Sequence, residues 1–172
     1  MHVAIISDTH GNVANFKKAV GWLNKENISL ILHCGDIGSP ESLKESLSDF
    51  KGELFGVLGN MDVDYKILID EYNKIPDVKV EEEVLETEVD GVKIAITHKP
   101  EQARSLAENK NFDLVFYGHT HKPWEEKVAC LQRQGNCRLI NPGELAGQIN
   151  KPTFAVYNTI TGELELKILE KL

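Results

Sequence analysis

The chain has 172 residues, of which 41% are hydrophobic and 27% are charged, and its formal net charge is −8. This length allows one sizeable core and is too short for two ordinary domains, so we predict a single domain over residues 1–172. The acidic balance argues against a nucleic-acid-binding patch, and no apolar stretch approaches the roughly 20 residues that span a bilayer. The N-terminus lacks the layout of a signal peptide. We therefore predict a cytoplasmic protein with no nucleic-acid or membrane partner.

The first half of the chain alternates predicted strands and helices. Short apolar runs predict buried strands at residues 2–6, 30–32 and 54–58. Apolar residues at helical spacing predict helices at residues 15–25, from Ser39 onward and at 64–75. Ser39 is the predicted N-cap of the second helix, with Pro40 at its first helical position. In the third helix, Ile67, Leu68 and Tyr72 are predicted to lie on one side.

The second half is predicted to be mostly β-structure. Residues 78–89 suggest an exposed strand or pair of strands, and Asp90-Gly91 is a hairpin turn signal. A strand at 92–96, a short helix at 101–109 and a strand at 114–117 follow. The remainder predicts antiparallel strands at 125–131, 137–140, 153–157 and 163–169. This order indicates a β-sandwich with helices on its outer faces, of the α+β or α/β class, whose strand-end loops converge at one edge.

Three cysteines, Cys34, Cys130 and Cys137, are too few for an extracellular disulfide framework. Cys130 and Cys137 flank a short segment and could face each other across a hairpin. We favour thiols at all three positions over a hairpin disulfide.

Polar residues with metal-binding side chains follow five of the predicted apolar runs. They are Asp8-Thr9-His10, Gly35-Asp36, Gly59-Asn60, Thr97-His98 and Gly118-His119-Thr120-His121. Each motif alone is weak, because Gly-Asp and Gly-Asn are commonly turns and a single histidine is commonly structural. Together they offer carboxylate, imidazole and amide donors, which suit Mn²⁺, Fe²⁺, Ni²⁺ or Zn²⁺. The absence of thiolate ligands argues against a structural zinc.

This ordered set resembles the calcineurin-like metallophosphoesterase superfamily, whose pattern is D-x-H, G-D, G-N, H and G-H-x-H. The resemblance covers residues 8–121, and Asn141-Pro142-Gly143 is also typical of that superfamily. The small size of the chain is similar to the compact phosphodiesterase group within it. The resemblance implies a four-layer αββα sandwich of the metallo-dependent phosphatase type.

The resemblance also implies a centre of two divalent ions, with Mn²⁺ preferred and Ni²⁺, Fe²⁺ or Zn²⁺ as alternatives. The first ion would take Asp8, His10, Asp36 and His121. The second would take Asp36, Asn60, His98 and His119. Asp36 is then the bridge, and Asp36, Asn60 and His98 are the predicted catalytic residues.

Two ions that share a carboxylate lie roughly 3.5–4 Å apart, and a hydroxide bridging them is a nucleophile at neutral pH. We predict in-line attack of this hydroxide on a small phosphodiester. Asn12 and Asn141 are candidate phosphate contacts, although surface turn residues are the favoured interpretation. Lys99 could contact substrate phosphate, but a solvated surface lysine is favoured there too.

The sequence departs from the superfamily at Met61, where many members carry the histidine that is thought to protonate the leaving oxygen. Methionine cannot donate a proton, and general acid catalysis is typically worth 10²–10⁴-fold. We therefore predict a preference for good leaving groups, unless Asp62 or a metal-bound water acts as the acid. The alternative function is a non-catalytic or weakly active scaffold of the same fold, as in the retromer subunit. Similar compact enzymes form dimers or tetramers, so a homodimer or homotetramer is expected.

Overall fold

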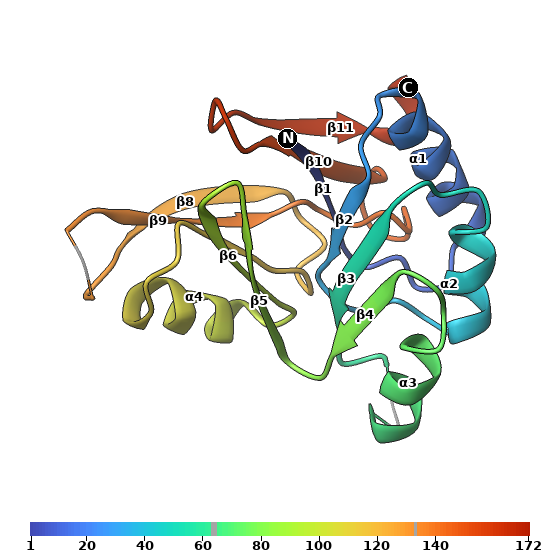
Figure 1. The fold of residues 1–172 in the computed structure, drawn as a ribbon, viewed down its shortest axis with the longest axis horizontal. Helices are drawn as coiled ribbons and strands as arrows, with labels where there is room; N and C mark the ends of the chain where they lie inside the picture. The colour runs from blue at the N-terminus through green and yellow to red at the C-terminus, as the bar shows by residue number, and fades with distance from the viewer. Residues whose placement is uncertain (63–64, 133) are drawn as a thin grey trace.

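A computed structural model describes residues 1–62, 65–132 and 134–172 of the chain. Two β-sheets lie face to face at its centre (Figure 1). The first sheet, in spatial order, holds β11 (Leu164–Ile168), β10 (Thr153–Asn158), β1 (His2–Ile6), β2 (Leu30–His33), β3 (Glu53–Val57) and β4 (Val78–Glu81). The second holds β5 (Val84–Val89), β6 (Val92–Thr97), β7 (Leu114–Phe116), β9 (Asn136–Asn141) and β8 (Trp124–Ala129).

Helices cover the outer face of each sheet. On the first sheet these are α1 (Val13–Lys25), α2 (Pro40–Ser46) and α3 (Tyr65–Tyr72), and a short 3₁₀ turn, η1 (Leu169–Lys171), packs there too. The second sheet is covered by α4 (Pro100–Asn109) (Figure 1). The predicted four-layer αββα sandwich is therefore confirmed.

The alternation of side chains along β1 explains how three apolar layers fit between four layers of backbone. Ala4 and Ile6 pack with the helices, whereas Val3 and Ile5 point the other way, into the core between the sheets. Successive strand residues face opposite sides, so a continuous apolar run serves two cores at once. The short buried strands predicted from such runs are confirmed.

The central strands are parallel, and this brings their carboxyl ends to one edge. β1, β2, β3 and β4 pair in parallel, as do β6, β7 and β9. The prediction of antiparallel structure after residue 125 is wrong in one respect, because β9 pairs in parallel with β7 and antiparallel only with β8. Residues 78–89 form two strands as one alternative foresaw, but these strands belong to different sheets.

The N-terminus of α2 follows its predicted cap. Ser39 accepts a hydrogen bond from the Ser42 backbone N–H and Pro40 occupies the first turn of α2. In α3 the prediction that Ile67, Leu68 and Tyr72 share one side is only partly right, because Leu68 packs inward and Tyr72 is buried while Ile67 is 67% exposed. Asp64, the predicted start of this helix, lies outside the described residues.

Cys130 and Cys137 carry thiols, as favoured, and so does Cys34. In the β8–β9 hairpin Cys137 lies opposite Val128, not opposite Cys130. Within the described part of the chain, no helix has the length and apolar character needed to cross a membrane.

Candidate metal centre

The residues predicted as metal ligands lie in the loops that follow β1, β2, β3, β6 and β7. Five of them have a positive φ angle: Asp8 (52°), His10 (45°), Asp36 (53°), His119 (66°) and His121 (59°). They make up five of the eight non-glycine residues with positive φ in the described ranges. This conformation costs energy for L-residues and is concentrated at functional sites. The loops are therefore held in turns that aim these side chains at a common point.

One group of the predicted ligands forms an inner half-site, which we define as Asp8, His10 and His121. The His121 Nε2 atom lies 3.3 Å from Asp8 Oδ1 and 3.4 Å from His10 Nε2. Together with Asp36, these residues can offer one ligand atom each, all within 4.8 Å of one another. The side chains are largely withdrawn from solvent, with Asp8 fully buried and His121 11% exposed.

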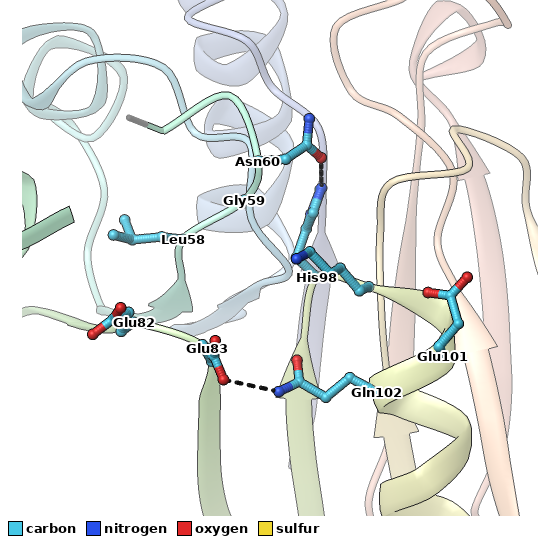
Figure 2. A pocket seen from close by; sticks show the side chains of 9 residues that line it. Leu58, Gly59, Asn60, Glu82, Glu83, His98, Glu101 and Gln102 are labelled. Carbon is cyan, nitrogen blue, oxygen red and sulfur yellow. Dashed lines mark hydrogen bonds between the residues drawn. The ribbon is translucent and has the colours of Figure 1, made fainter. Parts of the chain in front are cut away.

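The remaining ligands form an outer half-site, defined as Asn60, His98 and His119. The Asn60 Oδ1 atom lies 2.9 Å from His98 Nε2 and 2.8 Å from His119 Nδ1. Figure 2 shows the amide of Asn60 directed at the His98 ring. Asn60 and His119 are exposed, so this half-site faces solvent.

Asp36 lies between the two half-sites. Its Oδ2 atom is 3.8 Å from His10 Nε2 and 3.5 Å from His98 Nε2, one histidine from each half-site. Its Oδ1 atom accepts a hydrogen bond of 2.8 Å from the Met61 backbone N–H. The Asp36 carboxylate thus faces one histidine of each half-site.

The electrostatics of the centre favour a cation. Burial raises the pKa of Asp8 to about 7, and the charge of His121 and the hydrogen bond from the His119 backbone N–H oppose this only partly. Burial also lowers the pKa of His98, against the pull of Asp36. Buried carboxylates are normally paired or bound to metal, and this donor set of carboxylate, imidazole and amide suits divalent metals. The residues present therefore fit the implied ions.

A pocket of about 440 Å³ opens beside the outer half-site (Figure 2). Glu83 on its wall accepts a hydrogen bond of 3.2 Å from Gln102. Lys99 is exposed, as favoured, and it also lines this pocket. The lining residues are Leu58, Gly59, Asn60, Glu82, Glu83, His98, Lys99, Glu101 and Gln102.

Asn12 and Asn141, the two candidate phosphate contacts, use their side-chain amides to hydrogen-bond to the protein backbone. Asn12 caps α1 by accepting from the Asn15 backbone N–H at 3.1 Å, and it donates to the Ala146 carbonyl at 2.9 Å. Asn141 is only 2% exposed and donates to the Gly118 carbonyl at 2.8 Å. The surface-turn interpretation is therefore wrong for Asn141, which fixes the loop that carries His119 and His121.

Asp62 is also a loop-holding residue, which argues against its alternative role as general acid. It is 1% exposed, and its carboxylate accepts from the backbone N–H groups of Ile37, Gly38 and Gly59 at 3.1, 3.0 and 2.8 Å. Burial raises its pKa, while these hydrogen bonds oppose the rise. Both oxygens of this carboxyl therefore accept hydrogen bonds from the backbone of the loops after β2 and β3. Met61 beside it is 62% exposed.

Two supporting residues were missed in the sequence. His33, which is fully buried, has its Nε2 3.0 Å from Thr9 Oγ1 and its Nδ1 accepts from the Gly35 backbone N–H at 3.2 Å. Glu144, also fully buried, has its Oε2 3.1 Å from His121 Nδ1. Burial raises the pKa of Glu144, but hydrogen bonds from three backbone N–H groups and the charge of His121 outweigh it and the pKa is lowered. The only sequence signal for these two supporting residues was their position, because each is a polar residue within or close to a buried strand.

Comparison with known proteins links this geometry to a family. A family model described as the calcineurin-like phosphoesterase superfamily domain matches residues 1–162. The chain is 30% identical to phosphodiesterase MJ0936 of Methanocaldococcus jannaschii, over 99% of this chain and 100% of that protein. A solved archaeal phosphodiesterase superposes with a TM-score of 0.82 at 29% identity, covering 98% of this chain and 99% of the other. The phosphoesterase YfcE of E. coli shares the fold, with a TM-score of 0.65 at 15% identity, over 98% of this chain and 100% of the other.

Proposed function

We propose that this chain, which belongs to the calcineurin-like phosphoesterase superfamily, is a metal-dependent phosphodiesterase that acts on small phosphodiesters. The phosphodiesterase activity named for the M. jannaschii relative supports the proposal, since the identity extends over nearly the whole of both chains. The predicted cytoplasmic location, the single-domain organisation and the homodimer or homotetramer remain part of the proposal.

The observation that carries this function is the position of Asp36. Its carboxylate faces His10 of the inner half-site at 3.8 Å and His98 of the outer half-site at 3.5 Å. A carboxylate shared in this way suits two divalent ions, which would neutralise charge on a phosphoryl group from both sides. We propose Mn²⁺ as the preferred ion, with Ni²⁺, Fe²⁺ or Zn²⁺ as alternatives.

When bound, the two ions would supply Lewis acidity and the predicted bridging hydroxide that attacks phosphorus. The chain's own contribution is to hold the ligands in place and to shape the space around the phosphodiester. Asn60 and His98 belong both to the outer half-site and to the wall of the pocket, so they lie where a bound phosphodiester would meet the protein. The pocket then takes one alcohol group of the substrate, and Lys99 gives its wall one positive charge among Glu82, Glu83 and Glu101.

The test is hydrolysis of bis(p-nitrophenyl) phosphate by metal-stripped protein, with Mn²⁺, Ni²⁺, Zn²⁺ and Mg²⁺ added back in turn. We expect metal-dependent turnover that is lost in Asp36→Asn and His121→Ala. His2→Ala is a matched control, because His2 is an exposed histidine on β1, outside both half-sites.

The alternative function, a scaffold with weak or no catalysis, predicts a different result in the same experiment. Two ions bound per chain with no turnover of any phosphodiester would favour the scaffold. All seven candidate positions of this chain carry donor side chains, and this supports the enzyme.

A further inference from the structure

Glu144 is a fully buried acid in the loop after β9, and three backbone N–H groups donate hydrogen bonds to its carboxylate. Its Oε1 atom accepts from the backbone N–H groups of Ile149, at 2.8 Å, and Asn150. Its Oε2 atom accepts from the Gln148 backbone N–H at 2.9 Å and lies 3.1 Å from the His121 Nδ1. A buried carboxylate with three backbone donors is stabilised as the anion, so it acts only as an acceptor.

The two nitrogens of His121 face different partners. The Nδ1 atom faces Glu144, whereas the Nε2 atom faces Asp8 Oδ1 at 3.3 Å and His10 Nε2 at 3.4 Å. Because the carboxylate can only accept, the hydrogen bond requires a proton on Nδ1. In the neutral imidazole this leaves the lone pair on Nε2, directed into the inner half-site.

The corresponding histidine of the outer half-site is supported differently. The His98 Nδ1 atom lies 2.8 Å from the backbone carbonyl oxygen of Cys34, a neutral acceptor. A carboxylate behind a ligating imidazole makes the imidazole a stronger base than a carbonyl does, and loss of such a partner typically costs 10–100-fold in metal affinity or activity. His121 of the inner half-site is therefore supported by a carboxylate, whereas His98 of the outer half-site is supported by a neutral carbonyl.

We infer that Glu144 is a positioning residue for the metal centre, which holds the ring of His121 in the Nδ1–H tautomer and strengthens ion binding at the inner half-site. The inference rests on the proposed function for its metal, but it concerns a residue outside the predicted ligand set. It also gives the 145–150 loop a function, because the backbone N–H groups of Gln148, Ile149 and Asn150 hold the carboxylate in place behind His121.

The first experiment is titration of metal-free wild-type protein and Glu144→Gln with Mn²⁺, followed calorimetrically. The substitution removes the charge and puts an amide N–H₂ group against at least one N–H donor. We expect the Kd of the tighter site to rise by about 10–100-fold, with the Kd of the weaker site unchanged. Wild-type affinity at both sites in the Gln variant would overturn the inference.

The matched control is Asn150→Ala on the same loop. Its side-chain amide donates to the His121 backbone carbonyl at 3.0 Å, so this variant loses a loop contact to His121 and keeps the carboxylate. We expect a smaller loss of Mn²⁺ affinity in Asn150→Ala than in Glu144→Gln. A loss equal to that of Glu144→Gln would overturn the inference, since the effect would then come from the loop and not from the charge.

A second measurement needs no substitution at Glu144 and decides the matter if Glu144→Gln does not fold. Nitrogen-15 NMR of metal-free wild-type protein, with His121 assigned by its absence in His121→Gln, reports which ring nitrogen carries the proton. We expect a protonated Nδ1 and an unprotonated Nε2 in the neutral ring. The opposite tautomer would contradict the inference. Absent phosphodiesterase activity in the wild type would sink the proposed function alone and leave both the affinity and tautomer results standing.

Discussion

The inner and outer half-sites use the same kinds of side chain in different surroundings. The inner one is enclosed, with Asp8 fully buried and His10 and His121 only 14% and 11% exposed. The outer one opens to solvent and to the pocket through the exposed Asn60 and His119. Asp36 serves both, but the inner half-site has Asp8 as a second carboxylate while the outer one has only neutral ligands.

This difference implies that the two half-sites bind their ions with different affinities. An enclosed site with two carboxylates and a carboxylate-supported histidine should bind its ion tightly, because charge is concentrated where water is excluded. An open site with a single shared carboxylate should bind its ion more weakly and exchange it faster. Under the proposed function, we expect the substrate to approach from the outer side, where the pocket provides space.

The largest expected effect comes from substituting Asp36, the residue that both half-sites share. Among the described residues Asp36 is the only carboxylate that faces both half-sites, so we expect Asp36→Asn to lower the affinity for both ions. The rate of bis(p-nitrophenyl) phosphate hydrolysis should drop by more than about 100-fold, beyond the cost of losing a mere supporting residue. Metal content by mass spectrometry and initial rates check this. An Asp36→Asn protein that still holds two ions tightly would show that Asp36 is not the bridge.

Asn60→Ala separates the half-sites. We expect one ion per chain to be retained at wild-type affinity and the weaker ion to be lost. Turnover should fall by about 100-fold, because the phosphoryl group then loses the charge stabilisation that the second metal provides on one side. Equilibrium dialysis against Mn²⁺ gives the stoichiometry. Loss of the tighter ion instead would reverse the assignment of strong and weak binding.

The open side also lacks a proton donor at Met61, which is 62% exposed. Since Asp62 is committed to backbone N–H groups, we expect the rate to fall by about 10²-fold or more from p-nitrophenyl to phenyl leaving groups. Met61→His should speed the poor leaving groups selectively, and Met61→Gln serves as a control of similar size without an acid. A flat dependence in the wild type would mean that another acid, such as a metal-bound water, supplies the proton.

The smallest effect concerns the packing behind the inner half-site. Burial, with help from nearby His98 and His10, lowers the pKa of His33 to about 3, well below the ordinary value of 6.5. The unfolded chain therefore binds the additional proton between these values, so the free energy of unfolding rises with pH through this window. The contribution is complete above about pH 6.5 and is lost as pH falls towards 3.

We expect metal-free wild-type protein to lose up to about 1.4 kcal/mol more per pH unit than His33→Gln between pH 6 and about 4. Urea unfolding at several pH values measures both slopes. Parallel slopes would indicate that His33 takes up a proton in the folded protein without penalty.

Several features could be predicted because they depend on residue types at a local spacing in the sequence. The seven ligand candidates were recognised from donors placed after apolar runs, and Phe16, Ala19, Val20 and Leu23 of α1 follow from helical spacing and are buried. The Asp90-Gly91 turn was recognised from its chemistry, since both residues adopt positive φ. The apolar side of α3 was partly misjudged, because periodicity allows more than one apolar stripe and packing against the sheet selected Leu68 and Ile69 over Ile67.

Other features were decided by contacts between residues far apart in the chain. Nothing near Glu144 in the sequence identifies its partner, His121, which lies 23 positions earlier, and the same holds for Asp62 and the loop after β2, and for His33 and Thr9. The parallel pairing of β9 with β7 likewise depends on which strands become neighbours in the second sheet. By itself, the sequence determined which atoms can bind a metal and on which strand ends they stand, since donor chemistry and hydrophobic periodicity are local. Only the tertiary structure decided which of them are buried, which share a carboxylate and which are supported from behind, because burial and hydrogen bonding depend on distances that no local pattern specifies.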